Sequence, residues 1–225
     1  MTRLNIAMDG PVGAGKSSIA DAVAKRLGIL HLDTGAMYRA LGLKALREGM
    51  DVQDEEAMTR LCDRLELAVQ VGEKGQKTLL DGADVSGLIR TPEVSMAAST
   101  VSRYAGVRKR MVALQQALAA RQDMILDGRD ICTTVLPDAP LKIFLTASPE
   151  ERARRRWLEL QAKGAKDTLE EVLKQVLARD DQDMHRPVEP LRQAEDAVLV
   201  DTTDMSFDQV VDHIVKLAEA ISHGC

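Results

Sequence analysis

Residues 10–18 read GPVGAGKSS and directly follow a short apolar run, LNIAM, with one Asp between them. They fit the phosphate-binding loop pattern, in which a glycine and four further residues precede Gly15, Lys16 and Ser17. Glycines let backbone N–H groups turn towards phosphate oxygens, and the positive end of the following helix attracts the same anion. The pattern lies between a predicted strand and a predicted helix, as such a loop requires, which disfavours a chance glycine turn. We therefore expect the chain to bind a nucleoside triphosphate.

Each position of this loop has an expected task. Lys16 supplies a mobile positive charge for the β- and γ-phosphates, and the hydroxyl of Ser17 is the predicted Mg²⁺ ligand. The predicted ATP-binding residues are Gly10, Pro11, Val12, Gly13, Ala14, Gly15, Lys16, Ser17 and Ser18.

The rest of the chain alternates short apolar runs with longer helical patterns. The predicted strands are 4–8, 29–32, 124–127, 141–145 and 197–200, and predicted helices include 16–27, 36–47, 107–120 and 149–162. Strands that are apolar on both faces and alternate with helices indicate a parallel sheet covered on both sides. The expected fold is α/β, with a central parallel five-stranded sheet.

Two segments interrupt this alternation. Residues 64–90 alternate with period two and contain the turn signals GEKG and DGAD, which predicts a small antiparallel meander. Residues 150–186 form a charged helical pair with an expected hinge near Lys163. We expect three parts: a core with the phosphate loop (1–62, 102–149 and 187–225), an insert (63–101) and a helical lid (150–186).

Size and composition limit the possible functions. The 225 residues suffice for one core with an insertion, and 45% hydrophobic with 29% charged residues is typical of a folded soluble protein. The net charge of −5 argues against binding to nucleic-acid polymers or acidic membranes. Cys62, Cys132 and Cys225 have no disulfide or zinc spacing. We expect a cytoplasmic monomer that binds small molecules.

The class of phosphate-loop protein follows from what the sequence lacks. The single asparagine, Asn5, excludes the NKxD motif of GTPases, and there is no LSGGQ signature of transporter ATPases. A small phosphotransferase remains, and it needs a second, positively charged site. Ligands bind beyond the carboxyl ends of strands in an open α/β sheet, where DTGAMYR (33–39) and GRD (128–130) are expected.

The pattern TLEEVLKQVLARDDQDMHR at 168–186 contributes to this second site. An apolar row at Val172 and Val176 continues with helical spacing to Arg179, Asp183 and Arg186. The row is either a solvated helix end or a polar site beneath the helix, and alternating Arg and Asp favour binding. RARRR at 152–156 is either a charged surface or an arginine-rich lid over the transferring phosphoryl group, and a triphosphate-using enzyme favours the lid.

With these motifs the chain resembles the bacterial cytidylate kinases, a family of the nucleoside monophosphate kinase group. The carrying stretches are MDGPVGAGKSS, LDTGAMYR, DGADVSGLIRTPEVSMAAS, LDGRDICTTVLPDAPLKIFLTAS, EERARRR and ARDDQDMHRPVEPL. They extend over almost the whole chain in the family's order. The resemblance implies ATP- and Mg²⁺-dependent phosphorylation of CMP and dCMP to their diphosphates.

The resemblance also implies site residues. By position, the monophosphate-binding residues are Thr34, Tyr38, Arg39, Ser99, Arg108, Arg129, Asp130, Arg179, Asp183 and Arg186. Ser99, Arg129 and Asp183 are expected nearest the cytosine ring, and Arg39, Arg108 and Arg186 at the acceptor phosphate. Arg155 and Arg156 match the lid arginines that face ATP. Lys16, Arg129, Arg155 and Arg156 are the expected catalytic residues.

Two positions depart from the family pattern. Cys132 stands where the family commonly has glycine after GRD, and its side chain could re-aim the loop after Asp130. Thr34 replaces a frequent serine and keeps the hydroxyl.

The expected mechanism uses no general base, because the acceptor phosphate is largely dianionic at neutral pH. Catalysis then consists of positioning and charge neutralisation. Asp33 and Asp127 are candidates for holding metal-bound waters, and His31 is expected to be structural. Two alternatives stay open at this point: a kinase for another acceptor, such as UMP, AMP or a metabolite, and a non-catalytic nucleotide-binding module.

Overall fold

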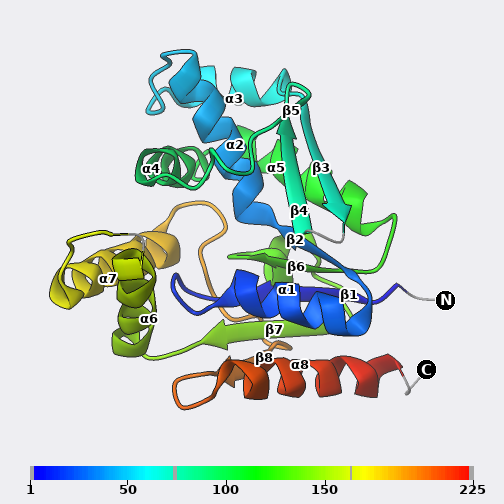
Figure 1. Cartoon of the computed structure of the whole chain (residues 1–225). Helices are drawn as coiled ribbons and strands as arrows, with labels where there is room; N and C mark the ends of the chain where they lie inside the picture. The colour runs from blue at the N-terminus through cyan, green and yellow to red at the C-terminus, as the bar shows by residue number, and fades with distance from the viewer. Residues whose placement is uncertain (1–2, 73–74, 163, 223–225) are drawn as a thin grey trace.

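A computed structural model describes residues 3–72, 75–162 and 164–222. Its centre is a parallel sheet in the strand order β2-β6-β1-β7-β8 (Figure 1). The strands are β1 (Asn5–Asp9), β2 (Leu30–Asp33), β6 (Met124–Gly128), β7 (Leu141–Thr146) and β8 (Val198–Asp201). Each coincides with a predicted apolar run to within one or two residues, so the expected five-stranded parallel sheet is confirmed.

Helices cover both faces of this sheet. Ile6 and Met8 of β1 pack against α1 (Lys16–Leu27) and α8 (Phe207–Ser222), whereas Ala7 between them belongs to the cluster on the opposite face. That second cluster includes α2 (Thr34–Arg47), α3 (Glu55–Asp63) and α5 (Ala105–Ala119). Because successive strand residues point to opposite faces, an uninterrupted apolar run supplies both cores.

The predicted insert forms a separate antiparallel sheet. Its strands are β3 (Leu67–Gly72), β4 (Gly75–Leu80) and the two-residue β5 (Ala83–Asp84), in the order β3-β4-β5. Glu73 and Lys74 of the predicted turn lie outside the described residues. The side chain of Gln76 accepts a hydrogen bond from the backbone N–H of Asp33 at 2.7 Å and donates one to its carbonyl at 3.3 Å. The insert is thus hydrogen-bonded to the end of β2, where α2 begins.

Two helices lie beside the phosphate loop and the end of β7 (Figure 1). They are α6 (Pro149–Ala162) and α7 (Leu169–His185), which begins at a capping box formed by Thr168 and Glu171. Ala153, Val172 and Val176 form a small core between them, and Val12 of the phosphate loop packs against it. Lys163, at the predicted hinge, lies outside the described residues.

Some elements had no counterpart among the predicted segments. They are α3, α8, α4 (Pro92–Val101) and a short π-helix, η1 (Ile131–Val135). Among the described residues, none of the helices combines the length and apolar character needed to cross a membrane.

Candidate active site

The phosphate loop leaves the end of β1 and is shaped by two glycines. A Cβ on Gly10 would lie 1.9 Å from the carbonyl oxygen of Leu145 in β7, so no other residue fits there without moving the strand. Gly15 has a φ of 86° and is the N-cap of α1, without a side-chain cap. The first N–H groups of α1 are therefore left for an anion.

Lys16 lies at the centre of this loop. Its Nζ donates hydrogen bonds to the carbonyl oxygens of Gly10 and Pro11, both at 2.7 Å, and the residue is 6% exposed. Burial and the neighbouring charge of Arg129 lower the pKa of Lys16 to about 7, against opposing contributions from nearby aspartates. An anionic ligand would strongly stabilise the charged form of this buried lysine.

Ser17 is the predicted metal ligand, and it contacts a carboxylate. Its hydroxyl donates to Asp127 Oδ2 at 2.8 Å, and His31 Nε2 lies 2.7 Å from Asp127 Oδ1. Burial by itself lowers the pKa of His31, but the hydrogen bond and charge of Asp127 outweigh it and raise that pKa. The hydroxyl of Ser17 keeps its lone pairs, and Asp127 adds a hard oxygen beside it. This oxygen-only donor set fits Mg²⁺.

A cavity of about 570 Å³ adjoins the phosphate loop on the side of α6 and α8. Its walls include Gly13–Gly15, the predicted lid arginines Arg155 and Arg156, and Phe207 at the start of α8. Arg155 donates to the hydroxyl and the carbonyl oxygen of Thr202, at 2.9 and 2.7 Å. Arg156 is paired with Glu159 at 2.8 Å. Both arginines thus face the expected ATP side while they bond to protein groups.

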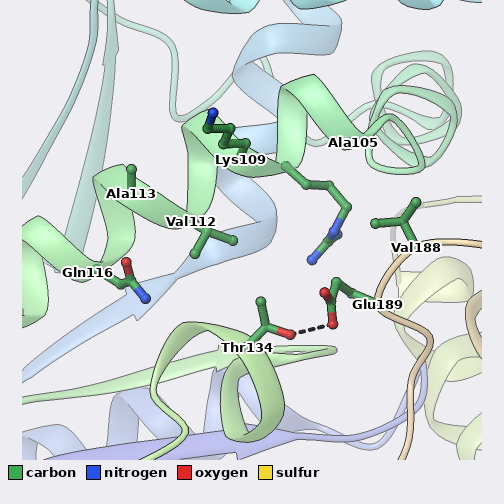
Figure 2. A pocket seen from close by; sticks show the side chains of 9 residues that line it. Ala105, Lys109, Val112, Ala113, Gln116, Thr134, Val188 and Glu189 are labelled. Carbon is green, nitrogen blue, oxygen red and sulfur yellow. Dashed lines mark hydrogen bonds between the residues drawn. The ribbon is translucent and has the colours of Figure 1, made fainter.

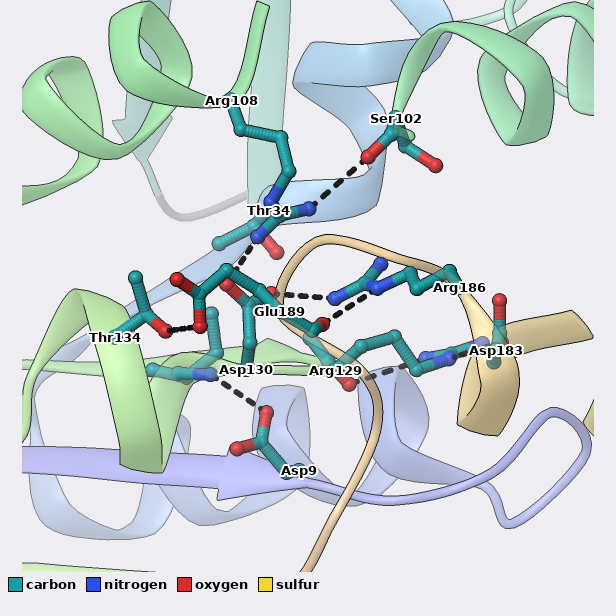
Figure 3. Close-up of polar contacts among 12 residues, drawn as sticks. Asp9, Thr34, Ser102, Arg108, Arg129, Asp130, Thr134, Asp183, Arg186 and Glu189 are labelled. Carbon is teal, nitrogen blue, oxygen red and sulfur yellow. Dashed lines mark hydrogen bonds and ion pairs between the residues drawn. The ribbon is translucent and has the colours of Figure 1, made fainter. Parts of the chain in front are cut away.

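Six of the predicted monophosphate-site residues form two adjacent groups of ion pairs at the carboxyl end of β6, one around Asp130 and one around Asp183, together called the arginine network (Figure 3). The carboxylate of Asp130 pairs with Arg108 and, at 3.3 Å, with Arg186. Asp183 pairs with Arg129 at 2.8 Å and with Arg179 at 3.2 Å.

The charges of this network do not balance. The four arginines of the network outnumber its two aspartates, and the nearby Glu189 acts on the pKa of Arg108 as a third negative charge, so an excess of positive charge remains for an anionic ligand. Burial and the neighbouring Arg108 lower the pKa of Arg186, and burial together with Arg129 lowers the pKa of Arg179. Crowded, buried guanidinium groups of this kind are relieved by an anion that accepts from several of them.

The remaining predicted residues surround this network. Thr34 donates from its hydroxyl to the carbonyl oxygen of Asp127 at 2.8 Å, and Arg39 pairs with Asp33 at 2.6 Å. The ring of Tyr38 packs against the core cluster and lies 5.9 Å from the guanidinium carbon of Arg108.

Ser99 is the one predicted residue supplied by α4. Its hydroxyl donates to the side-chain oxygen of Gln182 in α7 at 3.1 Å. The structure therefore gathers residues from five distant segments of the chain.

The helical row in α7 is not a solvated helix end. Val172, Val176, Asp183 and Arg186 are buried, and Arg179 is half-buried. The carboxylate of Asp33, a candidate for holding metal-bound waters, caps α2 through Ala36 N–H and pairs with Arg39.

Cys132 does not crowd the site. Its thiol lies 3.4 Å from the carbonyl oxygen of Ala7 and 3.6 Å from that of Ile143, so it points into the sheet. The carboxylate of Asp9 accepts from the N–H groups of Ile131 and Cys132, both at 2.8 Å, and holds the loop after Asp130.

The sequence pattern missed a buried link between the two sites. Arg152 donates to the carbonyl oxygen of Val12 at 2.9 Å and pairs with Asp180 of α7 at 2.7 Å. The sequence placed Arg152 in the predicted lid. Asp180 lies next to, but outside, the helical row of Arg179, Asp183 and Arg186 that indicated a binding site. Only the packing of α6 against the loop brings Arg152, Val12 and Asp180 together.

The sheet, the phosphate loop and the adjoining arginine network define a class of protein: a phosphate-loop kinase with a donor side and an acceptor side. Comparison with known proteins specifies the family. Residues 6–220 match the family described as cytidylate kinase. The chain is 48% identical to the cytidylate kinase of Caldicellulosiruptor saccharolyticus over 217 residues, 96% of both chains. It is 49% identical to that of Desulfitobacterium hafniense over 214 residues, 95% of this chain and 92% of the other.

The chain belongs to the cytidylate kinase family, so the resemblance is confirmed and the chain is a kinase that uses ATP as co-substrate. A solved structure of an uncharacterized protein from Eubacterium ventriosum has the same fold, with a TM-score of 0.53 at 14% identity. The two align over 97% of this chain and 99% of that one.

Proposed function

We propose that this chain transfers the γ-phosphoryl group of ATP reversibly to the phosphate of CMP and dCMP, in pyrimidine nucleotide metabolism. Family membership over nearly the full length supports this activity. The single structural observation that carries the assignment of the site is the largely buried network of four arginines and two aspartates beside the phosphate loop. Its excess of positive charge suits the phosphate of a nucleoside monophosphate.

The donor site consists of the loop Gly10–Ser18 and the adjoining cavity. The backbone N–H groups at the start of α1 and the Lys16 ammonium hold the phosphates, and the cavity beside Phe207 accommodates the nucleoside. Ser17 would hold Mg²⁺ through its hydroxyl, and Asp127, a candidate for holding metal-bound waters, lies beside it; the ion would supply positive charge that neutralises the phosphates of ATP.

The acceptor site consists of the arginine network with Thr34, Tyr38 and Ser99. Arg39, Arg108 and Arg186 bind the acceptor phosphate, and Ser99, Arg129 and Asp183 bind the cytosine ring. Arg179 contacts phosphate or sugar. The charges of Arg129 and Asp183 act on the pKa of Lys16, which supports the adjacency of donor and acceptor sites.

The chemical step needs no proton transfer from the acceptor, because its phosphate oxygen is already ionised. The chain contributes orientation and neutralisation of two polyanions that otherwise repel each other. The lid, residues 150–186, excludes water, and it moves so that Arg155 and Arg156 exchange Thr202 and Glu159 for phosphate oxygens. The core (1–62, 102–149, 187–225), the insert (63–101) and the second helix of the lid segment, α7, with the following Arg186, supply the two substrate sites between them. We propose that the protein works as a cytoplasmic monomer.

An ADP-release assay with a panel of acceptors tests this function. We expect turnover with CMP and dCMP, and much less with UMP, AMP and shikimate. Lys16→Met is the inactive control, and Lys25→Met, on the exposed side of the same helix, is the matched active one. Preference for another acceptor, or ADP release that does not depend on an acceptor, would refute the proposal.

A further inference from the structure

Glu189 adopts a costly backbone conformation next to the arginine network. Its φ is 47°, and among the described residues Asp81 is the only other non-glycine residue with a positive φ. Left-handed backbone costs free energy for a residue with a Cβ, and a residue before proline, here Pro190, ordinarily adopts an extended conformation. Such strain persists only where surrounding contacts hold it, and it is concentrated at functional sites.

The contacts of Glu189 show which groups hold this strained backbone conformation. Its carbonyl oxygen accepts a hydrogen bond from Arg186 Nε at 2.5 Å, and its carboxylate accepts one from the hydroxyl of Thr134, also at 2.5 Å (Figure 3). One residue in the segment after α7 therefore bonds both to an acceptor-site arginine and to the short helix η1.

Both partners are linked to the same residue, Asp130. Arg186 Nη2 pairs with Asp130 at 3.3 Å, and the backbone N–H of Thr134 donates to the carbonyl oxygen of Asp130 at 2.9 Å. Asp130 in turn pairs with Arg108. Because protein acceptors occupy Nε and Nη2 of Arg186, the direction of its guanidinium group is set before any ligand arrives.

Core packing does not require this arrangement. Glu189 and Thr134 line a cavity of about 420 Å³ between α5 and η1, together with Val112 and Val188, and they are hydrogen-bonded to each other at its wall (Figure 2). Truncation of Glu189 extends an existing cavity and leaves no new hole in a close-packed core, so the variant is expected to fold.

We propose that Glu189 is a positioning residue for the acceptor phosphate: its strained backbone and its carboxylate hold Arg186 and the loop of Asp130, and through Asp130 also Arg108 of α5, in the geometry that receives the phosphate of CMP. Glu189 does not touch the substrate and acts through Arg186 and Thr134. The inference rests on the proposed function, because it assumes that these arginines bind the acceptor phosphate.

Four variants test the proposal by steady-state kinetics and thermal unfolding. Glu189→Ala and Thr134→Val each remove one end of the same hydrogen bond, and we expect each to raise KM for CMP about tenfold, as for one lost hydrogen bond to a charged group. The double variant should show no further loss, because both changes break one contact. Glu189→Gln keeps an acceptor for the Thr134 hydroxyl and should stay within about threefold of wild type.

KM for ATP should change by less than about twofold throughout, since the donor loop is untouched. Asp81→Ala is the matched control: it truncates the other strained residue, which is exposed and paired with Lys44, and it should leave KM for CMP unchanged.

The possible outcomes distinguish a failure of this inference from a failure of the proposed function. If the wild type fails to phosphorylate CMP, the proposed function fails. If the wild type is active and the Glu189 and Thr134 variants lower the melting temperature without raising KM for CMP, Glu189 is only structural and the inference is overturned. Additive losses in the double variant, or equal losses for ATP and CMP, also overturn it. Should Glu189→Ala not fold, Thr134→Val and Glu189→Gln decide in the same way.

Discussion

Replacing Lys16 by Met should inactivate the enzyme and stabilise its ligand-free fold. Methionine has a similar length and no charge, so it can fill the space of the lysine stem inside the phosphate loop. Loss of the ammonium group removes a main positive charge at the transferring phosphate, and we expect kcat to fall at least about 100-fold. The ligand-free fold is stabilised because the ammonium of Lys16, a residue that is only 6% exposed, has no bound anion to offset the cost of its burial.

The size of the stabilisation follows from the pKa of Lys16. Burial, with the charge of Arg129, lowers this pKa from the ordinary 10.5 to about 7, which corresponds to about 5 kcal/mol against the charged form in the folded state. The hydrogen bonds to Gly10 and Pro11, lost in the variant, contribute about 1 kcal/mol each. At pH 7 the variant should therefore unfold with a free energy about 3 kcal/mol higher than wild type.

The difference should depend on pH in one direction. Between pH 7 and 10.5 the unfolded wild type keeps the lysine proton and the folded wild type has lost it, so wild-type stability rises with pH. The advantage of Lys16→Met is complete below about pH 7, shrinks through this window, and reverses near pH 10.5, where only the lost hydrogen bonds remain.

Urea unfolding of the ligand-free proteins at pH 7, 8.5 and 10 measures this difference, with ADP release as the activity assay. Lys25→Met, at an exposed position of α1 with 65% side-chain exposure, should leave stability and turnover nearly unchanged. A Lys16→Met variant that is less stable than wild type at pH 7, or whose advantage does not shrink with pH, would refute the reasoning.

Three further changes have definite outcomes. Asp183→Asn removes the negative charge that pairs with Arg129 and Arg179. KM for CMP should therefore rise about 30-fold or more, while KM for ATP changes less than about threefold. Equal increases in both KM values would show that Asp183 is outside the acceptor site. Cys132→Gly should lower the free energy of unfolding by about 1–3 kcal/mol without raising KM for CMP, because the thiol points into the sheet; a raised KM would contradict this. Burial raises the pKa of Asp9 to about 6, so between pH 4 and 6 the Asp9 carboxyl holds its proton in the folded state, and the free energy of unfolding falls as pH rises through this range. Asp9→Asn should remove this pH dependence in urea titrations, and an unchanged dependence would exclude Asp9 as its source.

The sheet was predictable because its central strands are buried on both faces. Runs such as LKIFL at 141–145 are apolar except for Lys142, and little except a central parallel strand satisfies that pattern next to helices. Helices α3 and α8 escaped prediction even though α8 has a clear apolar row at Val210, Ile214 and Ala218. That row was recognisable in the sequence. The short π-helix η1 had no periodic signal, because five residues are too few to show one.

The acceptor site was predicted in part from its residues. The row Arg179, Asp183 and Arg186 was visible because helical spacing alone puts these residues on one face. Ser99 and Arg108 came only from resemblance to a family. Glu189 carried no signal, because its role depends on a positive φ and on Thr134, 55 residues away.

By itself, the sequence determined the fold class, the phosphate loop and the chemistry of phosphoryl transfer. These depend on local order: apolar runs make strands, and a glycine loop with a lysine between a strand and a helix binds phosphate. The tertiary structure alone decided which carboxylate neutralises which arginine. Asp130 pairs with Arg108 and Arg186, Asp183 pairs with Arg129 and Arg179, and Asp33 pairs with Arg39. The physical reason is that an ion pair depends on the separation of charged atoms in space, and that separation exists only after distant segments have packed at the end of the sheet.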